Sequence, residues 1–262
     1  MSPLNKSHGR KSITASIAPR DLMVPNARLS QVWTADVITL FPDSFPGVLG
    51  ESLTGRALNE GKWALSTTDL RLCGQGKHKK VDDTPAGGGA GMVLRADVVG
   101  KAIDHVLHQQ KIAKPLILLS PRGRVFDQQM ANEWIKGAGI ILLAGRFEGV
   151  DQRVIEHYDI QEVSLGDFVM SGGEIAAQAV IDACVRLLPG VLGNTASIEE
   201  ESHQNGLLEY PQYTRPTEWN GKMIPDVLLS GNHQKIDEWR RSEAKELTKS
   251  RRPDLWAARK AR

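Results

Sequence analysis

Two short apolar runs, PLILLS (residues 115–120) and IILLAG (residues 140–145), carry the clearest fold signal in the chain. Each run is nearly continuous and is bounded by proline or glycine, which is typical of a strand buried on both faces of a parallel sheet. A third run, VWTADVITL (residues 32–40), is also rich in strand-forming residues. Stretches with helical spacing lie at residues 96–110 and 127–136. The alternation predicts an α/β fold with a parallel sheet and right-handed crossovers.

The hydrophobic periodicity also predicts where the chain divides. A helical stretch over residues 174–188 ends at a Pro-Gly pair, and the periodicity then disappears. We therefore expect an α/β domain over residues 32–192 and an interdomain linker over residues 193–206. Residues 207–262 are too few for a large core, so they predict a small, mostly helical domain.

The first 31 residues are rich in Ser, Lys, Arg, Pro and Asn and show no sustained period. This composition predicts a disordered basic extension over residues 1–31. A basic, acid-poor segment is also typical of an organelle presequence, and Met23 offers an alternative start.

The charge of the chain is unevenly distributed. The 262 residues carry a formal net charge of +2, but residues 1–30 hold a balance of +4 and residues 235–262 hold +5, which leaves −7 for the stretch between them. Two basic ends favour a polyanionic partner, although solvated, solubilising termini explain the same pattern. Hydrophobic residues at 40% and charged residues at 24% describe an ordinary globular protein.

Cysteine and histidine usage argues against a disulfide framework and against a metal centre. Cys73 and Cys184 are the only cysteines and lie far apart, which fits a reducing cytosol. His105 and His108 share a face of a predicted helix, but no third ligand accompanies them, so no metal site is predicted. No apolar run approaches membrane-spanning length, and the N-terminus lacks an apolar signal core. We predict a cytoplasmic protein with no membrane segment.

Unusual glycine content marks the segments PAGGGAGM (85–92), AGRFEGVD (144–151) and SLGDFVMSGGE (164–174), and LLSPRGR (118–124) also follows a predicted strand. The sequence contains no P-loop motif, and no G-x-G-x-x-G follows a strand, which argues against a dinucleotide-type site. Tight turns explain any one of these loops. Several loops at the carboxyl ends of parallel strands favour a ligand site, because glycine lets the backbone approach a ligand closely.

Ten motifs together resemble the bacterial tRNA (guanine-N1)-methyltransferases of the SPOUT class. They occur in the family's order and cover about residues 33–255. The motifs are ITLFPDSF (38–45), LTGRAL (53–58), VDDTPAGGGAGM (81–92), LSPRGR (119–124), AGRFEGVDQRVIE (144–156), SLGDFVMSGGE (164–174), PGVLGN (189–194), GLLEYPQYTRP (206–216), VLLSGNH (227–233) and RRPDL (251–255).

This resemblance implies a deep trefoil knot in the α/β domain, where S-adenosylmethionine binds in a bent conformation. It also implies a homodimer whose active site is completed across the subunit interface, and a magnesium dependence for which the sequence shows no dedicated cation site. The cofactor-binding positions that it implies are Leu119, Ser120, Pro121, Gly145, Glu148, Gly149, Leu165, Gly166, Asp167, Phe168, Val169, Met170, Gly172 and Gly173.

The implied substrate is the guanine immediately 3′ of the anticodon in tRNA, preceded by another guanine. Guanine N1 carries a proton at neutral pH, so methylation there needs a base and a cation that stabilises the charge developing on O6. The family's arginine falls on Arg186 and its linker aspartate on Glu201, which reaches about 1.5 Å further than aspartate. Glu200 is the nearest competing carboxylate, and Asp167 and Asp182 are more distant ones.

Five further residues are candidates for contact with RNA. Lys79, Lys80 and Asp82 form a charged loop beside a glycine run, and Tyr213 with Arg215 combines a stacking face with a charge. Phosphate contacts and base stacking are how unpaired loop nucleotides are usually held. Each residue alone is more simply explained as surface charge or domain packing.

Two alternatives remain at the level of sequence. A SPOUT-type RNA ribose 2′-O-methyltransferase would share the knot but would need neither the linker carboxylate nor the YTRP segment. A catalytically weakened RNA-binding homologue would retain the fold, and the glutamate at position 201 is the feature that supports it.

Overall fold

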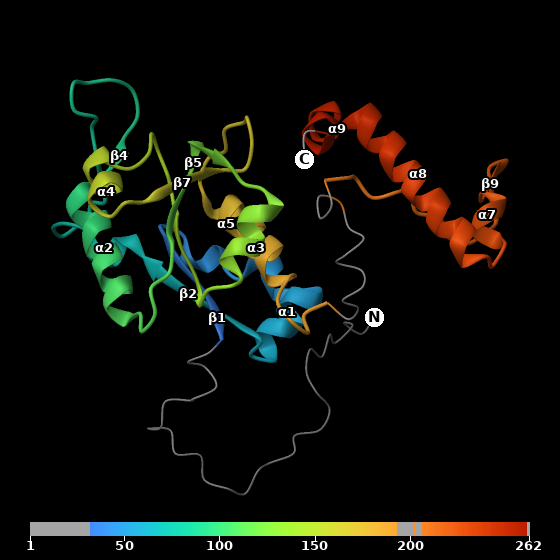
Figure 1. The fold of residues 1–262 in the computed structure, drawn as a ribbon. Helices are drawn as coiled ribbons and strands as arrows, with labels where there is room; N and C mark the ends of the chain where they lie inside the picture. The colour runs from blue at the N-terminus through green and yellow to red at the C-terminus, as the bar shows by residue number, and fades with distance from the viewer. Residues whose placement is uncertain (1–31, 193–201, 203–205, 261–262) are drawn as a thin grey trace, which may run out of the picture.

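A five-stranded parallel sheet forms the centre of the α/β part of the chain. The computed structural model describes residues 32–192, 202 and 206–260 (Figure 1). The strands follow the order β2-β1-β6-β5-β7, and every neighbouring pair is parallel. Their bounds are β1 (Trp33–Thr39), β2 (Trp63–Asp69), β5 (Leu116–Val125), β6 (Gly139–Ala144) and β7 (Gln161–Ser164).

Helices cover both faces of this sheet. The helices are α1 (Ser52–Asn59), α2 (Ala96–Gln109), α3 (Gln128–Trp134), α4 (Gln152–His157) and α5 (Glu174–Val185), with the short 3-10 helices η2 (Pro42–Ser44), η3 (Gly47–Gly50) and η4 (Leu70–Cys73). Alternate residues of β6 enter two separate cores: Ile140 and Leu142 pack with α3 and α5, whereas Ile141 and Leu143 pack with α2 and α4. The prediction of strands buried on both faces is therefore confirmed.

The sequence pattern missed the two edge strands. β2 has a half-polar sequence, WALSTTD, and β7 has only four residues, so neither presents a continuous apolar run. β5 is longer than predicted, because the chain bulges after Leu119 and resumes its pairing with β7 at Arg124. The predicted helix over residues 174–188 is α5, which ends at Val185 and continues as tighter turns.

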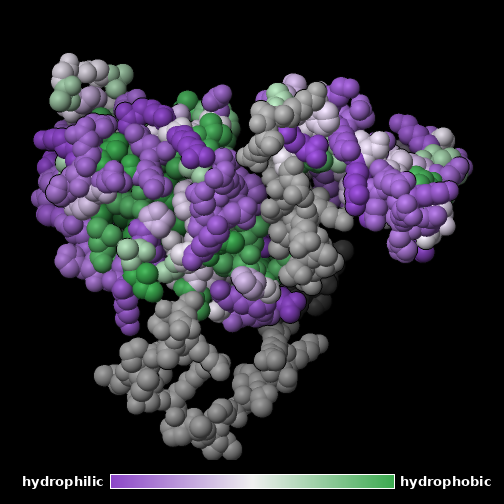
Figure 2. Space-filling view, viewed as in Figure 1, coloured by the Kyte–Doolittle hydropathy of each residue, from purple (hydrophilic) through white to green (hydrophobic). Residues whose placement is uncertain are grey.

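Residues 206–260 contain helices, as expected. The elements are β8 (Glu218–Trp219), β9 (Lys222–Met223), α7 (Asp226–Leu229), α8 (His233–Arg251) and α9 (Pro253–Lys260), and Figure 1 shows them apart from the five-stranded sheet. On the face seen in Figure 2 these helices carry mainly hydrophilic residues, and hydrophobic ones gather over the α/β elements. Thr248 of α8 holds the segment around Leu208 against this helix. Its hydroxyl accepts a hydrogen bond from Leu208 N at 2.8 Å and donates one to Ala244 O at 2.6 Å.

The antiparallel pair β3 (Asp82–Asp83) and β4 (Val93–Leu94) closes the glycine-rich loop of residues 84–92.

Within the ranges that the structure describes, no helix is long and apolar enough to cross a membrane.

Cys184 on α5 is expected to be unreactive in the native protein. It is fully buried, and burial raises the pKa of its thiol to about 12. At about pH 8 roughly one such thiol in ten thousand is ionised, against about one in four for an exposed cysteine with a pKa near 8.5. Iodoacetamide labelling followed by peptide mass spectrometry should detect Cys184 modification only after unfolding. Labelling of native Cys184 at the rate of a free thiol would contradict this placement.

Candidate functional site

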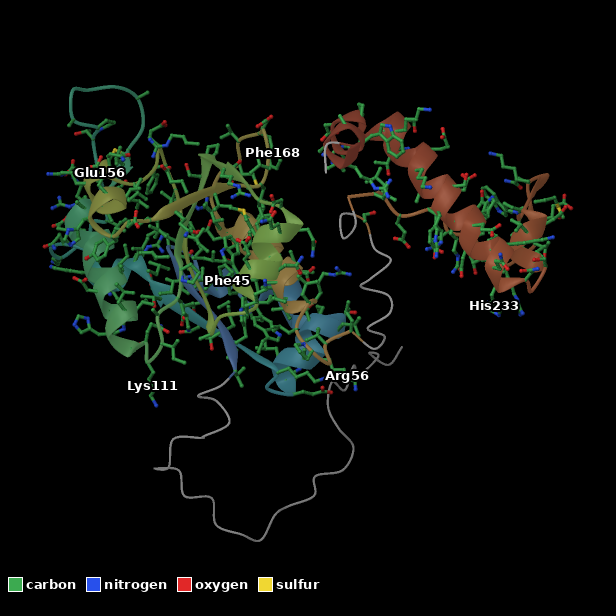
Figure 3. The ribbon with its side chains drawn as sticks, in the orientation of Figure 1. Phe45, Arg56, Lys111, Glu156, Phe168 and His233 are labelled. Carbon is green, nitrogen blue, oxygen red and sulfur yellow. The ribbon has the colours of Figure 1, made fainter. Side chains whose placement is uncertain are left out.

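The bulge of β5 and the loops that follow β6 and β7 meet around a cavity of about 210 Å³. These strands are neighbours in the order β6-β5-β7, so the bulge of β5 and the two loops lie together. Figure 3 labels Phe168 on the loop after β7. The carboxyl edge of a parallel sheet is the expected position for a ligand in an α/β fold.

Twelve of the fourteen predicted cofactor positions line this cavity. They are Leu119, Ser120, Pro121, Gly145, Glu148, Gly149, Leu165, Phe168, Val169, Met170, Gly172 and Gly173. Gly166 and Asp167 are not among the lining residues, and their predicted cofactor contacts stay predictions. Gly166 instead exchanges hydrogen bonds with the Ser164 hydroxyl, at 2.9 and 3.1 Å, and shapes a turn, while Asp167 is exposed to solvent.

Sequence reasoning missed further lining residues within or directly beside the same motifs. They are Leu118, Arg122, Arg146, Phe147, Val150, Val163, Ser164, Ser171 and Ala176. The apolar ones look like ordinary core positions, and Arg146 looks like a surface charge beside a glycine. For Arg146 and Phe147, the position in the loop directly after β6 was the signal that could have found them.

Two lining glycines are required by the packing of the loops against each other. A side chain at Gly172 would collide with the guanidinium of Arg146. A Cβ at Gly173 would lie 2.8 Å from Ala144 Cα, and the Gly173 N–H donates to Gly145 O at 2.8 Å. The loops after β6 and β7 therefore touch through backbone atoms, which any larger residue would push apart.

The glycine-rich loop of residues 84–92 reaches the same cavity through Glu148. A side chain at Gly91 would collide with the Glu148 carboxylate, and Glu148 N donates to Met92 O at 2.8 Å. Leu94 N donates to Gly149 O at 2.9 Å, which fixes β4 to the loop after β6. Glu148 is thus an acidic side chain of the cavity wall, and one backbone hydrogen bond from each of Glu148 and Gly149 ties this segment to residues 92–94.

Arg186, one of the two predicted catalytic residues, lies away from the cavity. Arg186 caps the C-terminal end of α5, where its N–H donates to Asp182 O at 3.1 Å. The cavity touches the opposite end of that helix at Gly173 and Ala176, and Glu174 is twelve residues before Arg186. At about 1.5 Å per residue, the two ends are about 18 Å apart. Glu201, Glu199 and Glu200 lie outside the described residues, and their predicted roles stay predictions.

The candidate RNA contacts fall in two groups. Lys79 and Lys80 are exposed, Lys80 pairs with Asp83 at 2.9 Å, and Asp82 is half-buried in β3. Tyr213 and Arg215 line a second cavity of about 310 Å³.

This second cavity lies against α7 and α8. The Tyr213 ring meets the Trp239 ring edge-on at 6.1 Å, and the Arg240 guanidinium lies 4.9 Å from the Tyr210 ring. Aromatic rings beside guanidinium groups are the combination expected for holding unpaired bases. Among the described residues, no group of three or more His, Cys, Asp or Glu side chains is arranged to hold a metal ion.

Comparison with known proteins agrees with this geometry. Residues 33–258 match the family model of the tRNA (guanine-1)-methyltransferase TrmD. The chain belongs to this family. Its members from Ruegeria sp. strain TM1040 and Roseobacter denitrificans, both named tRNA (guanine-N(1)-)-methyltransferase, are 66% and 61% identical to it. These matches cover 89% of this chain and 96% of the Ruegeria protein, and 92% of this chain and all of the Roseobacter protein. The TrmD family match thus includes the cavity, α5 and the C-terminal helices.

Proposed function

We propose that this chain is a methyltransferase that transfers a methyl group from S-adenosylmethionine to N1 of the guanine immediately 3′ of the anticodon in tRNA. The observation that carries the proposal is the meeting of three family motifs, LSPRGR, AGRFEGVD and SLGDFVMSGGE, around one cavity at the carboxyl edge of the sheet. The names of relatives that are 58–66% identical support the same reaction.

The cavity wall fits S-adenosylmethionine. Leu119, Leu165 and Met170 supply apolar surface for an adenine ring, and the glycine-rich loops bring backbone donors and acceptors to its edge. Glu148 supplies a negative charge that suits a ligand with a sulfonium and an ammonium group. When bound, S-adenosylmethionine supplies an activated methyl group.

The proposed architecture is a trefoil knot within residues 32–192. The backbone hydrogen bond from Gly173 N to Gly145 O supports it, because a knot would bring the loop after β6 and the loop after β7 together. The proposed division continues with a linker over residues 193–206 and a helical tRNA-binding domain over residues 207–262, preceded by a basic extension over residues 1–31. A cytoplasmic location is proposed because the substrate would be tRNA.

The active site is proposed to form between two copies of the chain. Arg186 lies about 15 Å along α5 from Ala176 in the cavity wall, so we infer that one chain alone does not bring it to a bound methyl donor. Large apolar side chains are exposed around this helix: Val48 of η3 is 68% exposed, and Ile175 of α5 is 66% exposed. A second copy that covers this surface would bury them and deliver its own Arg186.

Catalysis then needs a proton acceptor and a stabilising cation. Glu201 is proposed to remove the N1 proton and Arg186 to stabilise the charge that develops on O6. A carboxylate is a weak base in water, so the linker must exclude solvent when tRNA docks. A magnesium requirement is proposed on the family resemblance alone.

Binding to tRNA is expected to weaken steeply with salt. Lys79, Lys80 and Arg215 are exposed and would replace counterions on the phosphate backbone. Raising the salt from about 50 to about 200 mM should raise the Kd for tRNA roughly tenfold to a hundredfold. A Lys79→Ala/Lys80→Ala variant should show a shallower salt slope in a filter-binding assay.

The matched control for this assay is Lys111→Ala, because Lys111 is an exposed lysine that precedes β5, at the opposite edge of the sheet from Phe168 (Figure 3). It should keep the wild-type slope. An affinity that does not change with salt would exclude these lysines as the RNA contact surface.

The proposed function is tested by transfer of a labelled methyl group from S-adenosylmethionine to a tRNA transcript. The transcript with guanine after the anticodon should be labelled, and one with adenine there should not. Equal labelling of both transcripts would contradict the proposed target. Binding of tRNA without any labelling would favour a non-catalytic RNA-binding homologue.

A further inference from the structure

One arginine connects the two loops that form most of the cavity wall. Arg146 belongs to the loop after β6, and its Nη1 donates to Ser171 O of the loop after β7 at 3.0 Å. Its Nε and Nη2 lie 2.9 and 2.8 Å from Glu174 Oε2. Three nitrogen atoms of this side chain are thus committed to protein acceptors, although Arg146 itself lines the cavity.

Glu174 is held from the opposite side. It is the first residue of α5 and is only 4% exposed. Its Oε1 accepts a hydrogen bond from the Thr39 hydroxyl at 2.8 Å, and that hydroxyl accepts from Phe41 N at 3.0 Å. The Phe41 ring lies 4.5 Å from the Arg146 guanidinium. The arginine is therefore fixed by groups from the end of β1, from α5 and from the loop after β7.

The position of Gly172 shows how closely the loop follows this arginine. Any side chain at Gly172 would collide with the guanidinium, so the loop after β7 passes directly over it. Met170, Gly172 and Gly173 of that loop all line the cavity. The width of the cavity between the two loops depends on where this guanidinium is placed.

A net gain in folding stability is a weak explanation for the ion pair between Arg146 and Glu174. Burying a carboxylate and a guanidinium costs desolvation that their attraction often only balances, and well-packed apolar residues of similar size can serve as well. A fixed, planar arginine with several donors is suited to holding backbone segments at a defined separation.

We propose that Arg146 is a positioning residue for the methyl-donor site, held in place by Glu174. It keeps the loop of residues 165–173 at the distance from residues 145–149 that admits S-adenosylmethionine. This inference rests on the proposed function, because it assumes that this cavity binds the methyl donor.

The test compares three variants, Arg146→Met, Glu174→Gln and the double variant, by thermal unfolding and by calorimetric titration with S-adenosylmethionine. Arg146→Met leaves the Glu174 carboxylate buried and unpaired, so it should lower the Tm and raise the Kd for S-adenosylmethionine about tenfold or more. Glutamine at position 174 keeps an acceptor for Thr39 and removes the charge. The double variant should therefore recover most of the Tm but should keep the weakened affinity.

The matched control is Arg153→Met. The Arg153 side chain, on α4, is 80% exposed in its ion pair with Asp151. Its replacement should change neither the Tm nor the Kd for S-adenosylmethionine. Recovery of affinity together with Tm in the double variant would mean that the pair only stabilises the fold, and would overturn the proposal. An unchanged Kd in Arg146→Met would also overturn it. Wild-type protein that fails to bind S-adenosylmethionine would instead overturn the proposed function, and this inference with it.

Discussion

Replacing Glu201 with glutamine is expected to lower kcat for methyl transfer about a thousandfold, while the Kd for S-adenosylmethionine stays at the wild-type value. Glutamine has nearly the same shape but cannot accept the N1 proton, and general base catalysis contributes roughly a hundredfold to ten-thousandfold. Single-turnover kinetics with a tRNA transcript measures the chemical step separately from product release.

Two matched variants show whether the position or only the charge matters. Glu200→Gln removes a neighbouring carboxylate and should keep nearly full activity. Glu201→Asp restores the residue that the family resemblance implies and should remain active, since the proton acceptor is retained. If Glu200→Gln is the inactive variant instead, the assignment of the base is wrong.

Replacing Arg186 with methionine is expected to lower kcat about a hundredfold to a thousandfold, again with little change in S-adenosylmethionine binding. The guanidinium is proposed to stabilise charge that exists only as the proton leaves N1, so its loss affects the transition state more than the ground state. Arg186→Lys should recover part of the rate because it keeps the charge. If Arg186→Met lowers kcat and the affinity for S-adenosylmethionine by the same factor, the residue has a structural role.

The same variant tests whether the site is shared between subunits. An Arg186→Met chain and a chain whose cavity is filled by Met170→Trp should each be inactive as homodimers. Mixed dimers would contain one intact site, formed by the arginine of one chain and the cavity of the other. Equal mixing after reversible dissociation should therefore restore about a quarter of the wild-type activity. Mixtures that stay inactive would contradict a shared site.

Much of the fold could be predicted from local patterns. Residues 115–120 and 140–145 form strands because a continuous apolar run suits a sheet that is covered on both faces, and β5 and β6 are its central strands. β2 and β7 escaped prediction because an edge strand needs less apolar surface and leaves a weaker pattern. The bulge after Leu119 depends on pairing with a strand forty residues further along the chain, which no local pattern specifies.

The site was predictable where glycine follows a strand, and less so elsewhere. Gly172 and Gly173 were found by their motif, but the reason for them, contact with Arg146 and Gly145, depends on two loops far apart in the sequence. The ion pair of Arg146 with Glu174 had no sequence signal, since each residue alone resembles an ordinary surface charge. The separation of Arg186 from the cavity follows from the length of α5, and it becomes meaningful only when a second chain is considered.

Mass spectrometry of nucleosides and of RNase fragments, from tRNA incubated with the protein and methyl-labelled S-adenosylmethionine, tests the central claim most directly. We expect labelled 1-methylguanosine, confined to the fragment that carries the nucleotide immediately 3′ of the anticodon. A label on the ribose 2′-oxygen, or on a guanine elsewhere in the tRNA, would contradict it.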